Sequence, residues 1–94
     1  MFDDLEFCRQ LGVQQTALSL WIEEGWIRPE SSAGVWRFSA IDLARGRLIV
    51  DLRGAMGVND EGVAVILHLV DQLHGLRSAL HGIAASQATP SGRS

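Results

Sequence analysis

Residues 11–38 read LGVQQTALSLWIEEGWIRPESSAGVWRF, and this stretch decides the fold. Gly12-Val13 marks a turn, and apolar side chains then recur with helical spacing over about Gln15–Glu24. The side chains on the inward face of this helix are Leu18, Trp21 and Ile22. Gly25 can adopt the left-handed conformation that ends many helices. The stretch therefore predicts a turn and a helix that stops at Gly25.

A shorter helix is expected before this one, over about Asp3–Leu11. Asp3 or Asp4 can cap it, because a carboxylate accepts hydrogen bonds from the free N–H groups of a helix N-terminus. Its expected apolar face consists of Leu5, Cys8 and Leu11. Two helices joined by a short glycine turn form a helix-turn-helix.

Two short β-type runs follow the second helix, Trp26-Ile27-Arg28 and Val35-Trp36-Arg37-Phe38. The segment between them, Pro29–Gly34, is rich in turn-forming residues, so the two runs should pair as a hairpin. The sequence therefore predicts a small two-stranded wing after the helix-turn-helix.

A third helix should follow the wing, because Ser39 through Asp42 resemble a capping box. We expect this helix to run through about Met56 and to stop at Gly57. Its expected packing stripe consists of Ile41, Leu48, Leu52 and either Ala55 or Met56.

The last helix is the longest, over about residues 59–84, with Asn59 as its cap and acidic residues in its first turn. Apolar side chains at intervals of three and four form a heptad seam, which predicts a dimer interface. The seam residues are Ile66, Leu69, Leu73, Leu76, Leu80 and Ile83. A second apolar face, which can pack on the head, consists of Val63, Val65, Leu67 and Val70. The sequence leaves open that the seam packs instead on the third helix of the same chain.

The chain has the size and composition of one small globular domain, with 94 residues, 47% of them hydrophobic and 20% charged. We expect a mainly α fold in which a winged helix-turn-helix head, about 3–56, precedes a long C-terminal dimerisation helix. Head and helix would form a single domain over residues 1–85. The tail at 86–94 is rich in small and polar residues and is expected to be disordered.

The charge distribution narrows the possible functions. The net charge is −3, and residues 1–30 hold six acidic residues against two arginines, which argues against a strong grip on phosphates. The single cysteine excludes an intrachain disulfide, and no motif indicates a catalytic, cofactor or metal site. The acidic N-terminus is unlike a signal peptide, and no apolar run is long enough to span a bilayer. We therefore expect a non-enzymatic cytoplasmic protein without a cofactor.

The order of these elements resembles that of the MerR family of winged helix-turn-helix proteins. The resembling segments are Leu11-Gly12-Val13, Ala17-Leu18, Glu23–Pro29, Trp36–Ser39 and Asp42–Arg45. A narrower resemblance, over about residues 4 to 83, is to the chaperone-modulatory proteins called CbpM. The segments that carry it are Phe7-Cys8, Trp36-Arg37-Phe38, Asp51-Leu52, Gly57-Val58-Asn59, Gly62-Val63-Ala64, Leu69–Leu73 and Leu76-Arg77. Both resemblances imply a MerR-like winged helix-turn-helix.

The sequence departs from the DNA-binding pattern of the MerR family at two places. MerR-type recognition helices usually carry an arginine and an aromatic residue where this chain has Ser19 and Leu20. The wing usually carries two basic residues, but here Trp36 replaces the first and leaves Arg37 alone. Because phosphate contacts supply most nonspecific affinity, these departures argue against DNA binding. The alternative, a MerR-type transcription regulator, would bind DNA through Arg37, Arg45 and Arg47.

The resemblance to CbpM proteins implies an adaptor that binds the J-domain of a DnaJ/CbpA-type co-chaperone and inhibits its use of Hsp70. J-domains present a basic helix to Hsp70, and an acidic surface with apolar anchors is complementary to such a helix. From charge and helical spacing, the candidate contact residues are Gln15, Ser19, Glu23 and Glu24, with Asp3, Asp4 and Glu30 at the rim. The homodimer would form through the heptad seam.

Several of these features also have simpler explanations. Glu23 and Glu24 can be a solvated helix end, and Cys8 fits a small buried hydrophobe. Three tryptophans fit core and wing packing better than a ligand cage; they are Trp21, Trp26 and Trp36. Three histidines lack the i, i+4 spacing of a helical metal site; they are His68, His74 and His81.

Overall fold

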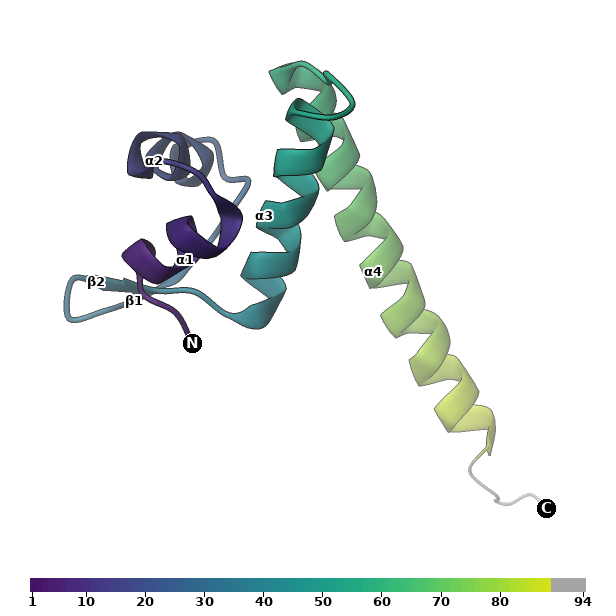
Figure 1. Ribbon diagram of the computed structural model, residues 1–94. Coiled ribbons are helices and arrows are strands. Elements are labelled where there is room, and N and C mark those ends of the chain that lie inside the picture. Colours follow the sequence, from purple (N-terminus) through teal and green to yellow (C-terminus); the bar gives the residue numbers. More distant parts are fainter. Residues whose placement is uncertain (89–94) are drawn as a thin grey trace. The chain divides into compact units, whose positions relative to one another are not determined.

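The computed structural model describes residues 1–88 and is mainly α-helical, with one two-stranded antiparallel sheet (Figure 1). Its elements are α1 (Asp4–Leu11), α2 (Gln15–Glu23), β1 (Glu30–Ser32), β2 (Val35–Arg37), α3 (Ala40–Arg53) and α4 (Asp60–Ala88). The predicted order of helix-turn-helix, wing, third helix and long last helix is therefore confirmed. The chain forms two compact units, a head unit over Met1–Val63 and a second unit that begins at Ala64.

The first two helices begin and end where local signals in the sequence place them. Asp3 caps α1, because its carboxylate accepts a hydrogen bond from the N–H of Glu6 at 2.8 Å. Gly12 ends α1 with a φ of 70°, and Gly25 follows α2 with a φ of 79°. Both glycines adopt the left-handed conformation that residues with a β-carbon rarely adopt.

The buried faces of these two helices were only partly foreseen. Leu18 and Trp21 of α2 are buried as predicted. In α1, however, Phe7 is fully buried and Leu5, which was expected to face inward, is 66% exposed. The Phe7 ring stacks on Phe38 with centroids 4.3 Å apart, so the aromatic contact decides which side of α1 faces the core.

The wing is the hairpin of β1 and β2, and its first strand lies later in the chain than predicted. Its cross-strand pairs are Glu30 with Arg37, Ser31 with Trp36, and Ser32 with Val35. The prediction of a strand at 26–28 was wrong, because the first strand begins only at Glu30. Trp26 and Ile27 are instead buried in the core. Their N–H groups donate to the carbonyl of Trp21 at 2.8 and 3.3 Å, so they follow α2 directly and take no part in the sheet ladder.

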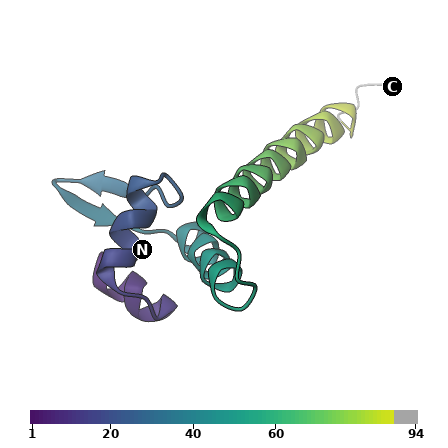
Figure 2. The same ribbon diagram turned by 90° about the horizontal axis from the view of Figure 1, so that it is seen from above.

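The chain's N-terminal residues add a short backbone pairing beside the wing. Phe2 and Phe38 exchange both backbone hydrogen bonds at 2.8 Å, and Phe38 is buried. Trp36, two residues earlier on β2, was expected to take part in core or wing packing and is 38% exposed. Figure 2 shows the hairpin extending away from the helices of the head unit.

The third helix begins as predicted and ends earlier. Ser39 and Asp42 form a capping box, in which the Asp42 N–H donates to Ser39 Oγ at 3.1 Å and the Ser39 N–H donates to Asp42 Oδ2 at 2.9 Å. The helix ends at Arg53 with Gly54 as its C-cap, three residues before Met56. Gly57 still has a positive φ of 64°, but it lies in the connection that follows.

The packing face of α3 differs from the predicted stripe. Its buried residues are Gly46, Ile49 and Leu52. Leu52 was predicted, but Ile41 is 79% exposed and Met56 is 67% exposed. Gly46 marks the contact with α1, because a β-carbon placed there would lie 2.5 Å from Leu11 Cδ1. The absence of a side chain lets α1 approach, which an apolar periodicity cannot reveal.

The last helix is capped by Asn59, whose Oδ1 accepts a hydrogen bond from the Gly62 N–H at 2.8 Å. Arg53 forms an ion pair with Asp60 at 3.4 Å beside this cap. The helix continues to Ala88, beyond the predicted end near residue 84. The remaining positions of the predicted tail, 89–94, lie outside the described residues.

The second apolar face proposed for the last helix is mixed. Val63 and Leu67 are buried, whereas Val65 is 58% exposed. As for the membrane, none of the helices within residues 1–88 has both the length and the apolarity that crossing it requires.

Candidate partner-binding surface

The outer side of α2 is the most coherent part of the predicted contact surface. Gln15, Ser19 and Glu23 are spaced four apart, so they lie along one side of the helix, and all three are exposed. Glu24 is exposed as well and forms the C-cap of the helix. No residue of α2 is basic. The helix and its C-cap therefore present two carboxylates and no basic residue, and the exposed Arg28 donates through Nε to the Gly25 carbonyl at 3.3 Å beside this end of the helix.

Leu20 belongs to the same surface and was not among the predicted contact residues. Its side chain is 39% exposed. It lies away from the buried pair Leu18 and Trp21, on the side that Glu23 and Glu24 occupy. Helical spacing places Leu20 outside the inward positions of an amphipathic helix, but only the structure shows that the side chain stays exposed.

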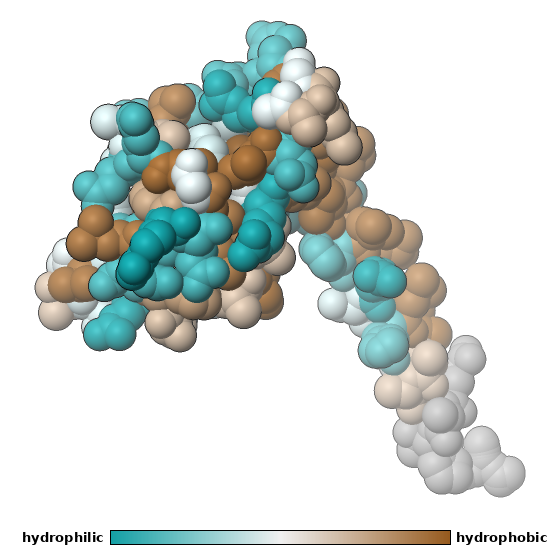
Figure 3. Space-filling view, in the orientation of Figure 1, coloured by the Kyte–Doolittle hydropathy of each residue, from teal (hydrophilic) through white to brown (hydrophobic). Residues whose placement is uncertain are grey.

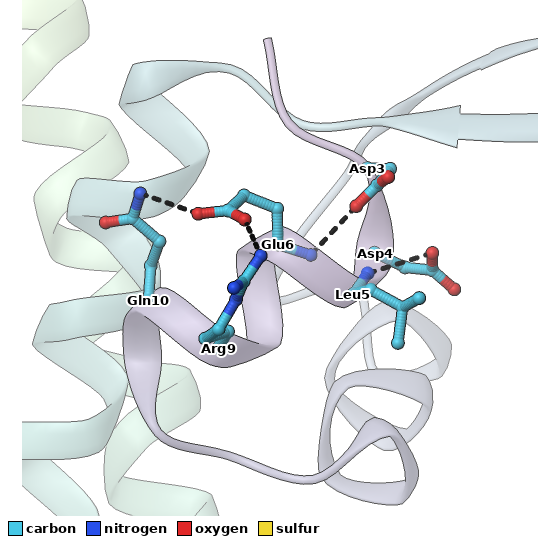
Figure 4. A network of polar contacts seen from close by, with 6 residues as sticks. All are labelled: Asp3, Asp4, Leu5, Glu6, Arg9 and Gln10. Atoms are coloured by element: carbon cyan, nitrogen blue, oxygen red, sulfur yellow. Dashed lines mark hydrogen bonds and ion pairs between the residues drawn. The ribbon is translucent and has the colours of Figure 1, made fainter.

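The rim residues of α1 are engaged by hydrogen bonds. The Gln15 side-chain amide donates to Asp4 Oδ2 at 3.3 Å, which joins Asp4 to the first turn of α2. Asp3 serves as the α1 cap, as described above. Figure 4 shows the neighbouring network, in which the Glu6 carboxylate accepts from Arg9 and, at 3.1 Å, from Gln10. Asp4 thus extends the α2 surface, whereas Asp3 has a structural role.

Glu30, the third rim residue, lies on the wing and faces Arg37 across the hairpin. Opposite charges at directly opposed positions of an antiparallel pair attract each other. Within residues 1–88, no hydrogen bond or ion pair links Glu30 to α2. The structure therefore places Glu30 and Arg37 together and does not join Glu30 to the stripe on α2.

The three arginines of the DNA-binding alternative occupy different environments. The Arg45 guanidinium donates through Nε to the carbonyl of Trp26, so it helps to hold the segment after α2. Arg47 is exposed and lies one turn before Asp51 on α3. Residues two apart on a helix point about 200° away from each other, so Arg45 and Arg47 face different sides of α3. Arg37 stands opposite Glu30 on the wing.

The predicted dimer seam of α4 forms an apolar stripe on the second unit, seen as brown atoms along one side of this helix in Figure 3. Five of its six members are between 53% and 59% exposed; they are Leu69, Leu73, Leu76, Leu80 and Ile83. Ile66, the first member, is half-buried. A stripe of this length on one chain is an apolar surface that a partner can cover.

Side chains that could jointly bind a metal ion are not gathered in the part of the chain that the structure describes. There, no group of three or more His, Cys, Asp or Glu residues is placed to hold a metal ion. Burial, and to a lesser extent the Asp4 carboxylate, raises the pKa of the Cys8 thiol above its ordinary value of 9.0. The thiol is therefore protonated near neutral pH and is a poor nucleophile.

A family model described as MerR HTH family regulatory protein matches residues 4–84. The match begins with α1 and ends in the last turns of α4, so it includes both units. Comparisons with curated proteins and with solved structures find no match.

Proposed function

We propose that this chain, which belongs to the MerR HTH family of regulatory proteins, is a non-enzymatic adaptor that binds the J-domain of a DnaJ/CbpA-type co-chaperone and inhibits its work with Hsp70. One observation carries the proposal. The outer side of α2, the helix that reads DNA in helix-turn-helix regulators, presents carboxylates and no basic residue. A partner with a basic helix fits this surface, whereas a phosphate backbone does not.

The state of the arginines supports the same proposal. Arg45 is bonded to the backbone of the head unit. Arg9 is paired with Glu6, and Arg53 with Asp60. Because cations already held by carboxylates or carbonyls release fewer counterions from DNA, these contacts weaken the case for a duplex as the partner.

We further propose that two copies associate through the α4 seam and that the protein acts in the cytoplasm. Seam side chains that are more than half exposed in one chain gain apolar contact when a second heptad seam covers them. A dimer would present two copies of α2, and thus two sites for a J-domain.

The proposal is tested by calorimetric titration of this protein with an isolated J-domain from the same cell. A parallel fluorescence-anisotropy titration uses random duplex DNA at low salt. We expect micromolar or tighter J-domain affinity, which is about −8 kcal/mol or better, and flat DNA binding. The variant Glu23→Arg/Glu24→Arg should lose most of the J-domain affinity, because it replaces attraction by repulsion.

The matched control is Asp51→Arg/Glu61→Arg, which changes the net charge by the same amount on α3 and α4. Its J-domain affinity should stay within about threefold of the parent, since distant surface charges contribute weakly. Equal losses in both variants would mean that α2 has no special role.

The competing function is DNA-binding regulation, which the family description and the exposed wing favour. If the J-domain does not bind and duplex DNA binds in a salt-dependent manner, the adaptor function is wrong and DNA-binding regulation is the function supported. In that case Arg47→Ala should lower DNA affinity and reduce its salt dependence by about one counterion.

A further inference from the structure

Leu20 is a large apolar side chain among mostly polar ones on the outer side of α2. Its neighbours on the helix surface are Thr16 and the half-buried Ala17, one turn earlier, and Glu23 and Glu24, one turn later. Thr16, Glu23 and Glu24 are exposed. Leu20 itself is 39% exposed. Ala17 is the one apolar residue among these neighbours, and its methyl group is too small to cover the Leu20 side chain.

The core of the head unit does not require Leu20. Leu18 and Trp21 fill the inward side of α2 and are 2% and 3% exposed. The other large apolar side chains exposed on the head unit lie on other segments; they are Met1, Leu5, Val35, Trp36, Ile41 and Met56. Leu20 is therefore the large apolar residue that α2 itself offers to a partner.

We propose that Leu20 is the apolar anchor of the α2 surface and seats against the apolar side of a basic amphipathic helix in the partner. The inference rests on the proposed function and adds the residue at its centre. Binding energy concentrates in a few buried apolar side chains with a polar rim around them, and Leu20 with Glu23 and Glu24 has this arrangement. Basic residues beside the partner's apolar stripe then face the two carboxylates.

A second copy of this chain is a poorer occupant of the same surface. Pairing α2 with another α2 would bring four glutamates together without a basic residue on either helix. Like charges across a contact oppose association. The charge of the surface therefore selects a basic partner over self-association.

The test is the affinity of full-length variants for the isolated J-domain, measured by calorimetry at low and at high salt. Leu20→Ala should weaken binding about tenfold or more, because truncation of a central apolar anchor costs more than that of a peripheral residue. Leu20→Met, which keeps an apolar side chain of similar volume, should restore binding to within about threefold. Circular dichroism checks that both variants keep their helices.

The matched control is Ile41→Ala, which removes a more exposed branched side chain from α3 and should leave the affinity unchanged. Salt separates the apolar from the electrostatic part of the contact. The loss in Leu20→Ala should persist at high salt, whereas the loss in Glu23→Arg/Glu24→Arg should shrink through screening.

The outcomes separate the two proposals. If the parent protein binds the J-domain and the affinity of Leu20→Ala equals that of Ile41→Ala, the proposal that Leu20 is an anchor is overturned. The proposed adaptor function then stands. If the parent protein does not bind the J-domain at all, both proposals fail. A variant Leu20→Ala that unfolds is replaced by Leu20→Gln, which keeps the length of the side chain and should show the same loss.

Discussion

The outer side of α2 and the seam of α4 both expose apolar side chains, but they differ in number and in surroundings. On α2, one leucine stands among threonine, serine and glutamate. On α4, five apolar residues more than half exposed repeat every three or four positions. A repeated apolar stripe is typical of a stable interface, whereas a single apolar residue with a charged rim is typical of a transient one.

The two surfaces also differ in the support behind them. α2 is held in the head unit by a core that includes Phe7, Phe38 and Ile49, each fully buried. Beyond Leu67, no side chain of α4 whose exposure is described, through residue 85, is fully buried. Isolated helices are marginal in water without a packed face. The head unit can therefore present a preformed surface, while the seam would gain a packed face through the proposed association with a second copy.

The largest effect is expected from breaking the seam. Leu73→Glu/Leu80→Glu should raise the dimer dissociation constant by about three orders of magnitude or more, because four carboxylates would be buried in the contact. Sedimentation velocity over a range of concentrations measures this. Gly75→Glu/Ser78→Glu, with the same charge on the opposite side of α4, should remain dimeric. A parent protein that sediments as a monomer at all concentrations would contradict the role assigned to the seam.

A smaller effect is expected from disturbing the head unit alone. Gly46→Val should lower the free energy of unfolding by about 2–3 kcal/mol, because its side chain would enter space occupied by Leu11 and Phe7. Gly46→Ala should be nearly neutral, since Leu11 can shift and alanine favours the helix. Urea titrations of the three proteins give these values. A valine variant as stable as the parent would mean that α1 and α3 pack less closely than described.

The stability of α4 can be changed without touching its seam. Gly75 is a helical glycine at which an added β-carbon meets nothing within 4 Å. Gly75→Ala should therefore stabilise the protein by about 0.5–1 kcal/mol, because alanine loses less backbone entropy in a helix. Its effect on J-domain affinity should be nil. Gly12→Ala is the opposite control, since a φ of 70° makes alanine unfavourable there.

The smallest effect concerns the pH dependence of the head unit. The raised pKa keeps the Cys8 thiol protonated in the folded state at pH values where the unfolded chain has lost this proton. The unfolded state then binds fewer protons, so stability falls as the pH rises above 9.0 and toward the folded pKa. Melting temperatures of the parent and of Cys8→Ala between pH 8 and 10.5 should diverge in slope. Parallel slopes would contradict a buried thiol.

Several parts of the fold follow from signals that act within a few residues. Asp3, the Ser39–Asp42 box and Asn59 all cap helices as the sequence predicts, because each bond joins atoms only three residues apart. Gly12 and Gly25 end helices for a reason that lies in their own backbone.

The candidate surface was foreseen in part for the same reason. Gln15, Ser19 and Glu23 share one side of α2 because helical geometry alone places them there. Leu20 was missed because its exposure depends on whether another element covers α2. Arg45 was assigned to a DNA-binding alternative because the sequence does not reveal its hydrogen bond to the Trp26 carbonyl. This bond joins residues that are far apart in the chain.

The sequence by itself determined the order of the elements, their caps and the heptad spacing of α4, since these depend on neighbouring residues and on the period of the helix. The tertiary structure alone decided that Phe7 rather than Leu5 faces the core and that Trp26-Ile27 is buried instead of forming a strand. The physical reason is that a side chain becomes buried only when another element packs against it, so its burial depends on two contacting surfaces. An apolar run has the same composition in a strand and in a buried connection, and only the contacting elements distinguish the two.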